Sequence, residues 1–334
     1  ELPDVIVDFK RDLYLDILTI KPNHAISHGN LGVLFKQIGD IKSAQKHLSK
    51  AISIDPKFID AFFNLGIIEK ELGNVEQSLN HFNSVLRLNP QSQNTLLNIG
   101  NLYFENAKHK IALEYFNRSL KIDGNHAPTH LAKGIVLQQL HHYSESIDAY
   151  KVALTIDPKL LDANFNLGVI FQTLENYEEA LLYYKIAQKI DPNSPDIFNH
   201  LGIIYARLER YEQAIENFKM GLSIAPSHAS LLSNIGNYYK MVGDNHNALA
   251  CLSKAQQEDP KNSDILLNLA HASLLHGDFK NGFSGYELRK VKSSLYNYFY
   301  NNDTDPSPEW RGQDISKKII LIFAEQGIGD TIQF

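Results

Sequence analysis

The sequence contains 334 residues, 21% of them charged, with a formal net charge of -6. This acidic balance gives no basic field for a phosphate backbone, which argues against nucleic acid as a partner. No apolar run reaches the roughly 18 residues of a membrane span, and a single cysteine, Cys251, excludes an internal disulfide framework, so we predict a soluble, cytoplasmic protein.

Two series of residues recur with a period of 34. Proline closes each period in all but one register, where glycine stands instead: Pro22, Pro56, Pro90, Gly124, Pro158, Pro192, Pro226 and Pro260. A small residue marks the middle of the first half of each period: Gly32, Gly66, Gly100, Gly134, Gly168, Gly202, Gly236 and Ala270. A fixed period of this length indicates an array of helical hairpins that bury their apolar faces against one another.

The array begins with residues 1–24, which match only the second half of a period because Tyr14 and Ile17 fall where Tyr184 and Ala187 do. We interpret this segment as an N-terminal half-repeat whose open face offers a route to self-association. Eight copies follow over residues 25–292, each predicted as two helices of about a dozen residues. A turn such as Gly39-Asp40 separates the two helices, and the Asp-Pro pair ends the second.

The small residues predict how the helices pack. Gly168, Ala180 and Ala187 mark faces where helices approach closely, and Phe171 and Tyr184 fill the neighbouring holes. We therefore predict an all-α fold, a right-handed α-solenoid whose first helices form a concave surface and whose second helices form the convex back.

The C-terminal part changes character. The eighth copy is degenerate and reads as a cap, and residues 293–317 read as a linker. Residues 318–334 combine an isoleucine-rich strand with a glycine loop and a helix start, so we predict the beginning of an α/β domain that continues in a longer protein.

The recurring pattern of NLG, alanine, aromatic, alanine and DP resembles tetratricopeptide-repeat (TPR) proteins, most of which bind proteins or peptides. The terminal motif EQGIGDTIQF resembles the junction in bacterial proteins that fuse a TPR array to a glycosyltransferase-like domain. This resemblance implies a two-lobed transferase fold starting at residue 318, with Gly327, Gly329 and Asp330 as a candidate nucleotide-sugar loop. The array is also similar to the superhelix of O-GlcNAc transferase.

Asparagine stands two residues before the small landmark in six copies: Asn30, Asn64, Asn98, Asn166, Asn234 and Asn268. A ladder of amides can donate to and accept from the backbone of an extended peptide, as the resembling ladder of O-GlcNAc transferase does. The alternative is that these asparagines bond the neighbouring helix.

Two further sets of residues accompany the ladder. Asp60, Asp162, Asp196 and Asp264 lie four residues earlier and can read side chains of a bound chain, although aspartate at a helix start is also favoured by the helix dipole. Phe63 and Phe165 belong to the row directly before the asparagines, which is mostly apolar and contains no lysine or arginine. This row favours a hydrophobic partner segment, or else packs between first helices.

The sequence predicts no metal site, cofactor or catalytic constellation within the array. His126 and His130 have a spacing that can hold a metal on a helix, but solvated histidines explain the pair better. We predict that this chain is not catalytic by itself, whereas the complete protein is a candidate glycosyltransferase.

These observations predict a protein-interaction module that binds a protein or extended peptide along the concave surface. Within a larger TPR-glycosyltransferase it would be the arm that recognises the acceptor. The alternative is a structural or oligomerisation scaffold without any link to a transferase.

Overall fold

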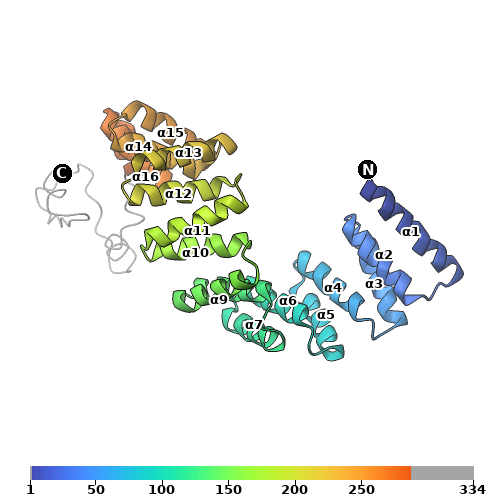
Figure 1. Cartoon of the computed structure of the whole chain (residues 1–334). Coiled ribbons are helices and arrows are strands. Elements are labelled where there is room, and N and C mark those ends of the chain that lie inside the picture. The colour runs from blue at the N-terminus through green and yellow to red at the C-terminus, as the bar shows by residue number, and fades with distance from the viewer. Residues whose placement is uncertain (1, 287–334) are drawn as a thin grey trace, which may run out of the picture. The chain divides into compact units, whose positions relative to one another are not determined.

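The computed structural model describes residues 2–286, and every regular element in this range is an α-helix (Figure 1). The all-α class is therefore confirmed for the described residues. The predicted linker at 293–317, the predicted strand and glycine loop at 318–334 and the end of the eighth copy lie outside this range.

Helix α1 (Leu2–Ile20) packs on α2 and is followed by eight helix pairs. The first helices of the pairs begin 34 residues apart and are α2 (Ala25–Gln37), α4 (Ile59–Glu71), α6 (Gln93–Glu105), α8 (Ala127–Gln139), α10 (Leu161–Thr173), α12 (Pro195–Arg207), α14 (Ala229–Met241) and α16 (Ser263–His276). The second helices are α3 (Ile41–Ile54), α5 (Val75–Leu88), α7 (His109–Ile122), α9 (Tyr143–Ile156), α11 (Tyr177–Ile190), α13 (Tyr211–Ile224), α15 (Asn245–Glu258) and α17 (Phe279–Tyr286).

The turn inside each pair requires one residue in the left-handed conformation. Glycine takes this place in four pairs, with φ between 77° and 91°, and a non-glycine residue takes it in the other four, with φ between 57° and 60°. Backbone hydrogen bonds fix the turn; in the second pair Asn74 N–H donates to the Glu69 carbonyl at 2.8 Å, which is the long bond of a Schellman motif. The predicted glycine turn is thus one version of a geometry that other residues also adopt.

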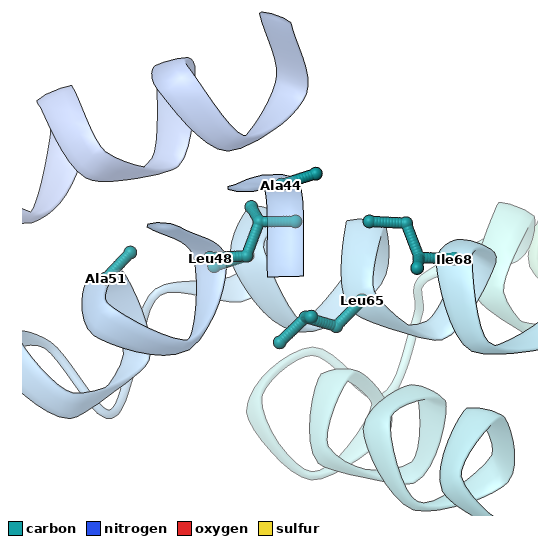
Figure 2. Packing of buried hydrophobic residues seen from close by; sticks show 6 residues of the cluster. Ala44, Leu48, Ala51, Leu65 and Ile68 are labelled. Atoms are coloured by element: carbon teal, nitrogen blue, oxygen red, sulfur yellow. The ribbon is translucent and has the colours of Figure 1, made fainter. Parts of the chain in front are cut away.

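Small residues allow the helices to approach one another. Between α3 and α4, the alanines Ala44 and Ala51 are buried together with Leu48 and Leu65 (Figure 2). Ala61 belongs to the same buried cluster. The landmark glycines serve the contact within a pair: a Cβ at Gly100 would lie 2.7 Å from Cδ1 of Phe116 on α7. Ordinary carbon contacts are about 3.5–4.0 Å, so only glycine fits there without displacing the ring.

The chain divides into two compact units, Glu1–Tyr183 and Tyr184–Phe334, and the boundary falls inside α11. Within each unit, most neighbouring first helices pack on one another, as α2 does on α4, α8 on α10 and α12 on α14. No two second helices inside either unit pack as closely among the described residues. In each unit the row of first helices therefore lies on the inner side of the local curve.

Candidate functional site

The six ladder asparagines lie on first helices, and every one of them is half-buried. Asn64 and Asn98 each donate one amide N–H to the backbone carbonyl four residues earlier, at 2.8 Å. Their Oδ1 atoms and second N–H groups remain available. Asn30 and Asn268 form no side-chain hydrogen bond with any described residue. At these four positions, the chain leaves amide bonding capacity for a partner.

The two remaining asparagines interact within the array. Asn234 Nδ2 donates to Asn199 Oδ1 at 2.7 Å, and this bond joins α14 to the nearly buried Asn199 on α12. Asn166 lies beside the hydroxyl of Tyr150 on α9; burial raises the pKa of Tyr150, and the neighbouring Ser146 and Asn166 side chains oppose that shift. The alternative role of the ladder, bonding to a neighbouring helix, therefore applies to Asn234 and in part to Asn166.

The four candidate aspartates are all exposed, each in the first turn of its helix. Asp196 is paired with His228, whose Nε2 lies 3.0 Å from Oδ1 of the carboxylate. The Asp60 and Asp162 carboxylates have no ion-pair or hydrogen-bond partner among the described side chains. Asp60 and Asp162 are thus better placed than Asp196 to meet a ligand.

The two candidate phenylalanines are half-buried. The Phe63 ring packs against Phe82, with ring centroids 5.7 Å apart, and both belong to one hydrophobic cluster. Phe63 therefore contributes to the packing between helices, and only its outer part can contact a partner.

An open pocket of about 150 Å³ lies between α2 and α4. Its α2 side consists of Gly29, Asn30 and Val33, and Asp60 and Asn64 line it from α4. It therefore brings two ladder asparagines and one candidate aspartate around a single cavity. The ladder predicted the amides at this place, whereas the cavity beside them was not predicted.

Three tetratricopeptide-repeat family models match five segments of the chain: residues 25–58, 60–92, 94–126, 162–194 and 195–228. Together they make up half of its length. The chain belongs to the tetratricopeptide-repeat family. No curated protein sequence matches it.

Solved structures show the same TPR fold at low sequence identity. A chain of the APC/C Cut9–Hcn1 hetero-tetramer is 18% identical with a TM-score of 0.57, covering 80% of this chain and 52% of that one. A TPR protein from Parabacteroides merdae is 19% identical with a TM-score of 0.56, covering 74% and 98%. Pseudomonas aeruginosa pilF is 20% identical with a TM-score of 0.54, covering 64% and 97%. These similarities show the fold alone.

In this TPR array the inner face of the first unit carries ion pairs that the sequence reading missed. Lys36 Nζ lies 3.1 Å from Glu71 Oε1, and Lys70 Nζ lies 2.9 Å from Glu105 Oε1, so each pair joins neighbouring first helices. The recurrence of lysine followed by glutamate 35 residues later is the signal that could have found them. Both lysines are neutralised, which leaves the unpaired Asp60 as the free charge at the pocket.

The inner face of the second unit is different. Lys240 stands at the register of Lys36 and Lys70, but the residue 35 positions later is Leu275 and not glutamate. Burial lowers the pKa of Lys240. Burial, together with the nearby Lys240, also lowers the pKa of His271. The Oδ1 atom of Asn237 on α14 is buried without a hydrogen-bond partner. Ser233 is the residue of α14 that belongs to the row without lysine or arginine. Two turns further along the same helix lies the half-buried Lys240.

The histidine pair considered as a metal site is used otherwise. His126 Nδ1 lies 2.7 Å from the Thr129 hydroxyl, and His130 Nε2 lies 2.9 Å from the Gly124 carbonyl. Residues 2–286 contain no group of three potential metal ligands and no helix long and apolar enough to cross a membrane. Gly327, Gly329 and Asp330 lie outside the described residues, so the nucleotide-sugar loop stays a prediction.

Proposed function

We propose that the first helices of the first unit bind an extended peptide, which makes this TPR array a protein-interaction module. One observation carries the proposal: Asn30, Asn64 and Asn98 stand at the same register on three successive first helices and retain unused amide groups. Amides that both donate and accept can satisfy a peptide backbone whatever its side chains are. The second unit is a weaker candidate because Asn234 is already bonded to Asn199.

Alanine at Asn30, Asn64 and Asn98 together tests this proposal. Each lost hydrogen bond is worth about 0.5–1.5 kcal/mol, so the triple variant should bind peptide at least about tenfold more weakly. The matched control replaces Asn80, Asn83 and Asn117, which are exposed on the second helices α5 and α7. Fluorescence anisotropy with labelled twelve-residue peptides gives the affinities, and equal binding by both triple variants would overturn the role of the ladder.

We further propose that the array is the acceptor-recognition arm of a TPR-glycosyltransferase. The support is the resemblance of EQGIGDTIQF and the residues before it to the junction of such fusions. The natural protein should then transfer sugar from a nucleotide-sugar donor to a protein bound by the array. Absence of transfer and of donor hydrolysis across the common donors would remove this proposal without touching peptide binding.

An oligomerisation scaffold is the second candidate, and α1 favours it. Phe9 and Ile20 on this helix are 68% and 79% exposed, although both are large apolar residues. Burying such side chains against a second copy would be favourable. Light scattering that finds only monomer, at concentrations up to the solubility limit, would exclude self-association through α1.

A further inference from the structure

We infer that the pocket between α2 and α4 is a specificity subsite that takes one leucine-sized side chain of the peptide, with a basic residue beside it. This inference rests on the proposed peptide binding and adds what the peptide must contain. The ladder by itself contacts only the peptide backbone, whereas a pocket between two of its amides contacts a peptide side chain.

The pocket lies beside Gly29, which has no side chain. The corresponding position carries Phe63 in the second TPR copy and Leu97 in the third. At Gly29, the ring of Phe58, the residue just before α4, lies against the helix, so that a Cβ there would be 2.7 Å from the ring Cζ. The ring therefore occupies the place that a side chain at residue 29 would take, and it lines the pocket together with Gly29. The pocket thus lies at a departure from the repeat pattern.

The size and lining of the cavity select its occupant. Small-molecule sites usually enclose about 300–1,000 Å³, so the 150 Å³ present here is too small for a drug-sized ligand. An enclosed apolar cavity of this volume holds a benzene-sized group, whereas this pocket is open and partly polar. Val33 and Phe58 supply half-buried apolar walls, and Leu48 and Ala61 line the pocket with almost fully buried side chains. A leucine side chain fits this space, and a tryptophan side chain exceeds it.

The mouth of the pocket sets the flanking chemistry. Asn30 and Asn64 lie on its two sides with free amide groups, so they can bond the peptide backbone before and after the inserted residue. Asp60 is exposed at the same mouth and its carboxylate is unpaired among the described residues. Lys36 and Lys70 are held by glutamates and do not neutralise it. A lysine or arginine next to the inserted residue complements this charge.

The test uses fluorescent twelve-residue serine/threonine peptides with a central Lys-X-Lys, where X is leucine, alanine, tryptophan or aspartate. Leucine should bind at least about tenfold more tightly than alanine, because it buries three more carbons at about 0.8 kcal/mol each. Val33→Phe fills the pocket and should reduce leucine binding to the alanine level. Val169→Phe, at the same register on α10 and also half-buried, is the control and should bind as the unmodified protein does.

Asp60→Asn adds a readout that does not depend on the packing of Val33→Phe, since Asp60 is exposed. Asp60→Asn should reduce the factor by which the Lys-Leu-Lys peptide binds more tightly than a Ser-Leu-Ser peptide. The pocket inference is overturned if the unmodified protein binds the four peptides with equal affinity. If alanine at Asn30, Asn64 and Asn98 abolishes that binding, peptide binding by the ladder is still supported. If no peptide binds the unmodified protein, both are overturned.

Discussion

Replacing Gly100 by alanine tests whether the landmark glycines exist for close packing. The new Cβ would lie 2.7 Å from Cδ1 and 3.0 Å from Cζ of Phe116, and closer still to Cε1, so the ring or the helix pair must shift. Overpacking of this kind costs about 1–3 kcal/mol. Alanine regains about 1 kcal/mol over glycine in a helix, which leaves a net loss of stability of about 0–2 kcal/mol.

Gly124→Ala is the matched control in the same TPR copy. Its Cβ would find no atom nearer than the Leu120 carbonyl oxygen at 3.9 Å, so we expect a gain of about 0.4–1 kcal/mol from the less flexible unfolded chain. Urea unfolding followed by circular dichroism compares the two variants. Native-state hydrogen exchange then shows whether the loss is confined to α6 and α7, as nearest-neighbour stacking requires. Equal stability of the two variants would refute the packing explanation.

Three further measurements test other features. Gly73→Ala should destabilise the array by about 1 kcal/mol through its φ of 77° alone, since no atom lies within 4 Å of the new Cβ; an unchanged urea midpoint would contradict this. Burial lowers the pKa of His200 from 6.5, an effect that the nearby Asp196 opposes. The unfolded chain therefore takes up a proton before the folded one does, so this contribution to stability is present above pH 6.5 and is lost as the pH falls from there toward the lowered pKa. Thermal melts at about pH 7.5 and 5.5 should show that loss, and His200→Asn should reduce it. Burial also raises the pKa of the Cys251 thiol, so its alkylation at about pH 8 should be slower in the folded than in the urea-unfolded protein; equal rates would show that the thiol is not shielded.

The sequence predicted the repeating part of the fold because each landmark has one local cause. Gly100 must be small where Phe116 crosses it, and Pro90 cannot continue a helix. Both effects act within one copy or between neighbours, so the period reveals them. The turn was only partly predicted: Ala107 and Glu175 adopt the same left-handed conformation as the glycines, with φ of 57° and 59°. Local hydrogen bonding there outweighs the preference for glycine.

The candidate site was less predictable because it depends on contacts between copies. Nothing in the register of Asp196 shows that His228 would reach it, and the same holds for Asn234 and Asn199. The pocket was missed because it depends on how the Phe58 ring packs against Gly29, and Gly29 by itself looks like an ordinary gap in an apolar row. A periodic sequence shows where a residue stands, whereas its bonding partners depend on what the next copy places opposite.

The bonding partners of each ladder asparagine decide where in the TPR array a peptide can gain most binding energy. An asparagine already bonded to the chain must give up that bond before it binds a peptide, so its net contribution is small. Asn234 must break its hydrogen bond to Asn199, whereas Asn30 has no such bond and faces an open pocket. Binding energy should therefore concentrate at the place where the repeat pattern is broken by Gly29. Alanine at Asn30 should then weaken peptide binding more than alanine at Asn234, although the two residues occupy the same register.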